Sequence, residues 1–201
     1  MHIRKKRPTL MDVNDYFKHG HYTVNKSDYV TNEERIKEAQ RISQELYKIA
    51  SKSVPRTRNL EYMILKCHLI IEYALTQYIR FFSEPVVEPK DIRFSFSQKL
   101  DIAYFMGFGT TEPTLIPSIE LLNRARNQVA HSFILDKSIL NELIRINSED
   151  HDDFTLPSPT EQIRALRQIT HAVCGITSGF IIARSFFSLS WNEDKIRRND
   201  K

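Results

Sequence analysis

Apolar residues recur at helical spacing along most of the chain, and no useful length of it alternates as a strand does. Capping boxes, in which a hydroxyl and a Glu or Gln three residues later satisfy free backbone donors, mark several helix starts. They occur at Thr31 and Glu34, Ser95 and Gln98, and Ser158 and Glu161. The pattern predicts helices over residues 31–51, 60–82, 95–107, 117–134, 137–146 and 158–189. We therefore expect an all-α fold, arranged as an antiparallel helical bundle.

The two ends of the chain differ in composition from this helical region. Residues 1–30 are polar and include the basic run Arg4-Lys5-Lys6-Arg7, and residues 192–201 form a charged tail. We therefore expect one helical domain over residues 31–191. The net charge of +4 comes from 29 basic and 25 acidic residues, so the basic run alone accounts for it. A protein that coats nucleic acid through its overall charge is not indicated.

Metal and cofactor signals are weak. His19 and His21 flank a glycine, and the acidic loop over residues 149–153 lacks the ligand spacing of a calcium loop. The sequence has no glycine-rich phosphate loop and no paired zinc-ligand motif. We therefore expect no metal and no organic cofactor.

Cysteine usage and hydropathy predict a cytoplasmic protein without a membrane anchor. Cys67 and Cys174 form no Cys-x-x-Cys pair, which fits core residues in a reducing compartment. The most apolar stretch, residues 172–189, contains Arg184 and several serines, which favours a buried core helix over a membrane span. The basic N-terminal start lacks the apolar run of a signal peptide.

Candidate chemistry lies on the predicted helix 117–134. Arg126 falls in the middle of an apolar stripe, and a buried arginine needs an anion, for which Glu72 in the apolar helix 60–82 is our candidate. Asn127 and His131 share another face, and His131 points about 140° away from Arg126 on an ideal helix. A site using both therefore suggests a groove beside the helix or two copies meeting at a dimer axis. His68, one turn before Glu72, is interpreted as a core histidine.

Three stretches together resemble one known family. Residues 126–131, Arg-Asn-Gln-Val-Ala-His, resemble the Arg-x4-His motif of HEPN domains, including the polar residue after the arginine. Residues 70–75 resemble the acidic central helix of that family. Residues 96–104 resemble the segment before the motif helix in its mannitol-operon-repressor-like branch. The similarity covers about residues 60–133, and it implies a bundle of the HEPN type.

The resemblance implies metal-independent RNA cleavage by a homodimer whose two motifs face one cleft. His131 would take the proton of a ribose 2′-OH, because imidazole titrates near neutral pH. Arg126 would neutralise the charge on the phosphoryl oxygens, and Asn127 would orient the phosphate or the imidazole. The family also implies an antitoxin or another regulatory protein as partner, in a toxin or antiviral-defence setting. Phe133 stands where many related toxins carry a nucleotide-accepting tyrosine, which argues against inhibition by nucleotide transfer there.

The sequence leaves three other interpretations open. Arg126 and His131 could form a structural salt bridge and a polar helix end. The HEPN fold could serve as a non-catalytic dimeric regulator, since fold does not determine function. A helix-turn-helix DNA binder could use residues 97–106 and 118–134, although the connection through Gly107 and Gly109 is long for a tight turn.

Overall fold

The computed structural model describes residues 32–83, 93–132, 135–148 and 157–199, with side chains up to residue 186. Every regular element within these ranges is a helix, which confirms the all-α class. The helices belong to one compact unit, Asn32–Lys201. The N-terminal extension with its histidines, the capping residue Thr31, the acidic loop and Phe133 lie outside the described residues.

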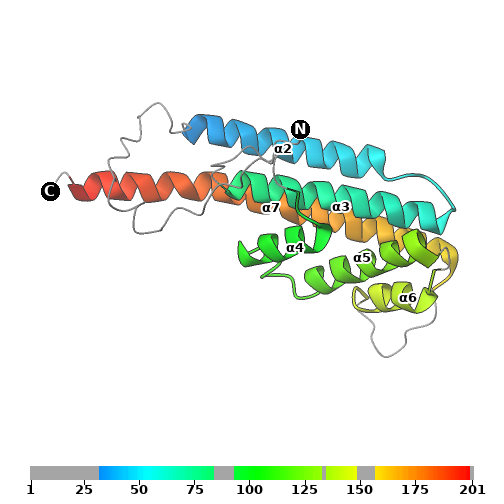
Figure 1. Cartoon of the computed structure of the whole chain (residues 1–201). Coiled ribbons are helices and arrows are strands. Elements are labelled where there is room, and N and C mark those ends of the chain that lie inside the picture. The colour runs from blue at the N-terminus through cyan, green and yellow to red at the C-terminus, as the bar shows by residue number, and fades with distance from the viewer. Residues whose placement is uncertain (1–31, 84–92, 133–134, 149–156, 200–201) are drawn as a thin grey trace, which may run out of the picture. The chain divides into compact units, whose positions relative to one another are not determined.

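Three long helices share the main core: α2 (Asn32–Ser53), α3 (Leu60–Phe82) and α7 (Pro159–Asn199). α7 packs along both α2 and α3. In Figure 1, α2 runs antiparallel to α3 and α7, whereas α3 and α7 run in the same direction. The expected antiparallel arrangement therefore holds for only part of the bundle.

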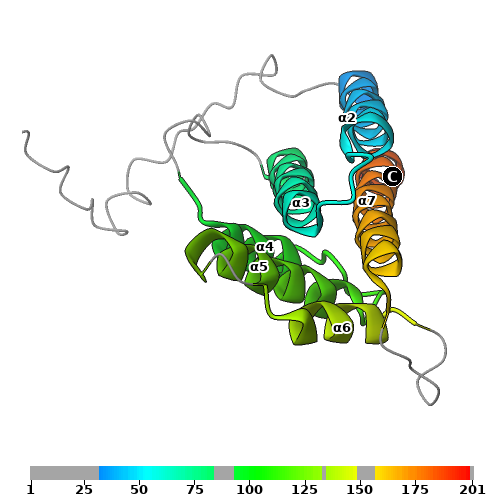
Figure 2. The ribbon, with the colours of Figure 1, turned by 90° about the vertical axis from the view of Figure 1, so that its right-hand side faces the viewer.

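Three shorter helices lie on another side of the main core. They are α4 (Phe96–Phe105), α5 (Leu115–Ser132) and α6 (Lys137–Arg145). Two of them, α4 and α5, pack on α3. Figure 2 shows α4 and α5 across α3 from α2 and α7, while α6 packs on α5 and also contacts α7. α3 is therefore the central helix, which explains why apolar residues occupy nearly its whole circumference.

Local capping chemistry explains where most helices begin. The Asn59 Oδ1 accepts a hydrogen bond from the backbone N–H of Tyr62 at 2.7 Å, and Ser95 with Gln98 forms the predicted capping box before α4. The Ser158 hydroxyl and the Glu161 carboxylate exchange the equivalent bonds before α7. These contacts confirm the helix starts predicted from the sequence.

Two helix bounds differ from the prediction. α5 begins at Leu115 rather than at Pro117, because proline is tolerated anywhere in the first helical turn, where its missing N–H is not needed. α7 continues to Asn199 instead of ending near Leu189. Its last residues contain no glycine or proline and are rich in charged residues with good helix propensity.

α7 is long and apolar enough over Pro159–Phe186 to cross a membrane by length and composition alone. The mean hydropathy of its most apolar window is 1.2, and 39% of that window is buried within the domain. Core helices of soluble proteins pass the same test, so the segment is weak evidence for a membrane span.

The two cysteines are buried thiols, as predicted. Cys67 lies on α3 and Cys174 on α7, and neither forms a disulfide. Burial raises the pKa of Cys67 to about 11 and that of Cys174 to about 12. Both thiols therefore stay protonated at neutral pH and serve as core residues.

Candidate active site at the end of α5

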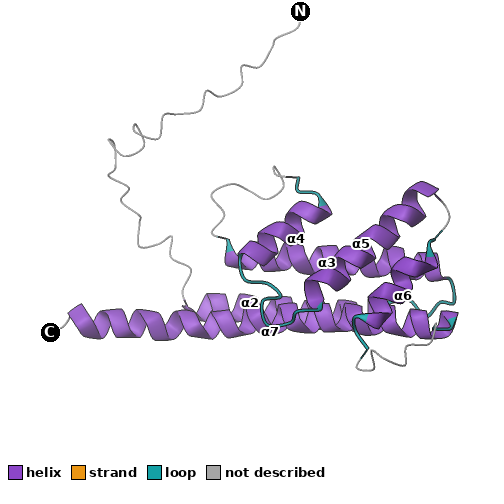
Figure 3. Ribbon diagram, turned by 90° about the horizontal axis from the view of Figure 1, so that it is seen from below, coloured by secondary structure: helices purple, strands orange, loops and turns teal. Residues whose placement is uncertain are grey.

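The Arg-x4-His motif lies where α5 leaves the core. The last buried residue of α5 is Ala125, Arg126 is half-buried, and Asn127 and His131 are exposed. Figure 3 shows this end of α5 extending past α3, on the side away from α7. All three candidate side chains are therefore on an accessible part of the domain.

Arg126 has no carboxylate partner among the described residues. Its Nη1 donates a hydrogen bond to the Oδ1 of the neighbouring Asn127 at 3.0 Å. The ion pairs of the described domain involve other basic side chains. The predicted pairing of Arg126 with Glu72 is therefore wrong, and no carboxylate of the described residues makes Arg126 half of a structural salt bridge.

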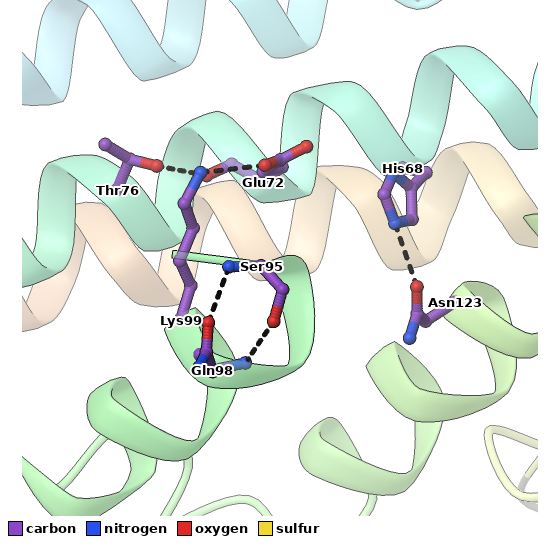
Figure 4. A network of polar contacts seen from close by, with 7 residues as sticks. All are labelled: His68, Glu72, Thr76, Ser95, Gln98, Lys99 and Asn123. Atoms are coloured by element: carbon purple, nitrogen blue, oxygen red, sulfur yellow. Dashed lines mark hydrogen bonds and ion pairs between the residues drawn. The ribbon is translucent and has the colours of Figure 1, made fainter. Parts of the chain in front are cut away.

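Glu72 instead joins α3 to α4. The Lys99 Nζ donates to the Glu72 Oε1 at 2.7 Å, with the two side chains 18% and 30% exposed respectively (Figure 4). α4 brings Lys99 to Glu72 because its capping box at Ser95 and Gln98 fixes how the helix begins beside α3. Glu72 therefore has a structural role near the motif and does not neutralise Arg126.

His68 is a core histidine, as interpreted from the sequence. It is 3% exposed, stacks on Phe96 with ring centroids 4.1 Å apart, and its Nε2 lies 3.1 Å from the Oδ1 of Asn123 on α5 (Figure 4). Burial lowers the pKa of His68, and the nearby charges of Arg126 and Lys99 add to this, against the Asn123 bond and the Glu72 charge. A neutral imidazole therefore links α3 to α5 beside the motif.

His131 stands apart from this network. It is exposed, and it makes no hydrogen bond or ion pair with any residue that the structure describes. Arg126 is near enough to His68 for its charge to lower the pKa of the imidazole, whereas His131 is exposed. Arg126 and Asn127 are thus joined by a hydrogen bond, whereas His131 shares the exposed face of Asn127 without a hydrogen bond to either residue.

Two residues beside the motif were not predicted from the sequence. Asn123 lies one turn before Asn127 on α5, and this helical spacing is a signal that could have pointed to it. Lys99 lies on another helix, so no spacing in the sequence indicates that it pairs with Glu72. Among the described residues, no three His, Cys, Asp or Glu side chains gather as metal ligands.

No model of a known protein family, no curated protein and no solved structure matches the chain. The likeness to HEPN domains therefore rests on the three sequence stretches alone. The helix-turn-helix interpretation gains nothing from the fold, because residues 106–114 separate α4 from α5, well beyond a tight turn.

Proposed function

We propose that this protein is a metal-independent endoribonuclease of the HEPN type. One observation carries the proposal. Arg126 lies at the accessible end of α5 with no carboxylate to neutralise it among the described residues, and Asn127 holds its guanidinium at 3.0 Å. A half-buried guanidinium without an acidic partner favours an anion as ligand, and a phosphodiester fits its planar pair of donors.

His131, Arg126 and Asn127 each have a separate role in the proposed cleavage of RNA. His131 takes the proton from a ribose 2′-OH, and the 2′-oxygen attacks the adjacent phosphorus. Arg126 stabilises the charge that develops on the phosphoryl oxygens, and Asn127 positions the guanidinium. The 5′-oxygen leaves and takes up a proton, so the products are a 2′,3′-cyclic phosphate and a free 5′-OH. DNA lacks the attacking hydroxyl and is not cut.

The proposal includes a partner and a setting. Because His131 and Arg126 diverge on one helix, the site is completed by a second copy of the chain, with two motifs facing one cleft. An antitoxin or another regulatory protein restrains the activity in a toxin or antiviral-defence role. The place of action is the cytoplasm, where Cys67 and Cys174 remain reduced.

The test compares wild-type protein with His131→Ala on RNA in the presence of EDTA, with DNA of the same sequence as control. Wild type should cut RNA, and loss of the general base should slow cleavage by about 10²–10⁴-fold. The fold should persist because His131 is exposed and buries nothing. Equal cleavage by both proteins would show that the chemistry lies elsewhere or that a contaminant cuts the RNA.

A non-catalytic dimeric regulator is the second candidate. One observation favours it: no hydrogen bond from a described residue orients the His131 ring, whereas a general base usually has such a partner. This function predicts that neither wild type nor His131→Ala cuts RNA, while both bind the same ligand or partner.

A further inference from the structure

Four arginines surround an open pocket that contains no residue of the Arg-x4-His motif. The pocket has a volume of about 630 Å³ and is lined by Arg56, Arg58, Arg164 and Arg167, with Thr57 and Thr160 beside them. None of its lining residues is acidic. It is therefore a concentration of positive charge in a chain whose helical region is nearly neutral.

The connection between α2 and α3 and the first turns of α7 build this pocket together. Arg56 and Arg58 belong to the connection, and Arg164 and Arg167 share one face of α7 because they are three residues apart. The Arg167 Nη2 donates to the Pro55 carbonyl oxygen at 3.0 Å, which ties the connection to α7. This hydrogen bond fixes the connection that carries Arg56 and Arg58 against α7, so the pocket is lined by a helix as well as by a loop.

The charges in the pocket are poorly compensated. None of the four arginines forms an ion pair with a described residue. Glu161 interacts with Arg164 at a distance: the pKa of Glu161 is lowered first by hydrogen bonds with Ser158 and then by the charge of Arg164. Like charges gathered in this way repel one another, and a bound anion would relieve the repulsion.

We propose that the pocket binds phosphate groups. Guanidinium groups match phosphate oxygens with paired donors, and the threonine hydroxyls add further donors. α3 and α7 both begin here, and helix N-termini favour negative charge. No aromatic side chain lines the pocket, so it offers phosphate contacts but no surface on which a base would stack.

Two sources of phosphate fit this chemistry: the backbone of an RNA strand and a free polyphosphate compound. Figures 1 and 3 both place the starts of α3 and α7 at the same end of the domain as the end of α5. An RNA strand held by the pocket would therefore be at the same end of the domain as the Arg-x4-His motif. The pocket itself stands whether or not α5 cuts RNA.

Calorimetric titration of the full chain with tripolyphosphate in EDTA tests the pocket. Arg58→Gln combined with Arg164→Gln should weaken binding about 10- to 100-fold, because two charged donors are lost. The matched control, Arg93→Gln with Arg184→Gln, removes two exposed arginines elsewhere and should change the affinity by less than about twofold. Absence of binding to wild type, or equal losses in the two variants, would overturn the proposal.

Anisotropy with a labelled single-stranded RNA, on the His131→Ala chain to prevent cleavage, identifies the source. If the variant with both Arg58 and Arg164 replaced loses RNA affinity as well as tripolyphosphate affinity, the pocket binds an RNA backbone. If it keeps its RNA affinity but no longer binds tripolyphosphate, the pocket binds a free polyphosphate. If the double variant fails to fold, as judged by circular dichroism, the single change Arg56→Gln takes its place. Phosphate binding without RNA cleavage would contradict the proposed function and leave the pocket in place.

Discussion

Arg126 carries a charge that no carboxylate of the described domain neutralises. The free energy of unfolding should therefore change little when Arg126 is replaced. Breaking a buried ion pair costs about 3–5 kcal/mol, but Arg126 forms no ion pair with a described residue. We therefore expect Arg126→Gln to abolish RNA cleavage while lowering the free energy of unfolding by less than about 1 kcal/mol. Urea denaturation and the cleavage assay measure the two effects. Arg41→Gln, an exposed change on α2, should leave cleavage intact.

A large loss of stability in Arg126→Gln would contradict this account, because it would reveal a partner that neutralises the guanidinium. Changes at Arg126 and at Glu72 should therefore have different effects. A change at Glu72 should act on the packing of α3 against α4, whereas a change at Arg126 should act on chemistry.

The buried imidazole of His68 makes stability depend on pH. Its pKa lies below the ordinary 6.5, so between the two values the unfolded chain binds a proton that the folded chain does not. The stability from His68 is therefore complete above about pH 6.5 and is lost as the pH falls below it. His68→Gln should flatten this part of the curve of unfolding free energy against pH. His171→Gln, an exposed change on α7, should leave its slope unchanged.

Single-residue patterns predicted exposure and burial near the motif better than they predicted partners. The helical spacing indicated that Asn127 and His131 share a polar face, and both are exposed. The prediction that Glu72 pairs with Arg126 failed because opposite charge shows only that each side chain needs a partner, and not which partner lies within reach. Lys99 and Arg126 are chemically similar candidates, and only the placement of α4 decides between them.

Whole helices were predicted well where local chemistry marks their ends. α3 and α4 begin at the caps that their sequences supply, and the described residues include the caps themselves. The relative direction of packed helices was not predicted in this way. α3 and α7 run in parallel with the short helices α4–α6 between them in the chain, and no capping signal in the sequence indicates that direction.

The pair Glu72–Lys99 is an ion pair between α3 and α4, and its contribution to stability can be measured. Because both side chains are partly exposed, we expect Glu72→Gln to lower the free energy of unfolding by about 1 kcal/mol, between values for surface and buried pairs. Glu142→Gln, which breaks the exposed pair with Arg145, should lower stability less than Glu72→Gln does. A double-mutant cycle with Lys99→Met isolates the coupling. No coupling between the two positions would remove this link from the account.

At the scale of the whole molecule, the domain buries its apolar side chains around α3 but leaves several large ones accessible. Leu69 on α3 is 57% exposed, and Tyr104 and Phe105 at the end of α4 are 55% and 91% exposed. Single exposed apolar residues are common, yet these lie on the helices that flank the motif. They agree with an assembly in which α3 or α4 contacts another chain.

We expect a two-fold homodimer in solution, because Arg126 and His131 point about 140° apart on an ideal helix and a second copy is needed to complete a site. Light scattering should give twice the chain mass of 23.6 kDa at micromolar concentration. Mixing Arg126→Gln with His131→Ala adds a functional test. If a guanidinium of one chain and an imidazole of the other act on the same phosphate, mixed dimers recover cleavage that neither variant has alone. A monomer at high micromolar concentration, or an inactive mixture whose chains demonstrably exchange, would contradict the shared cleft.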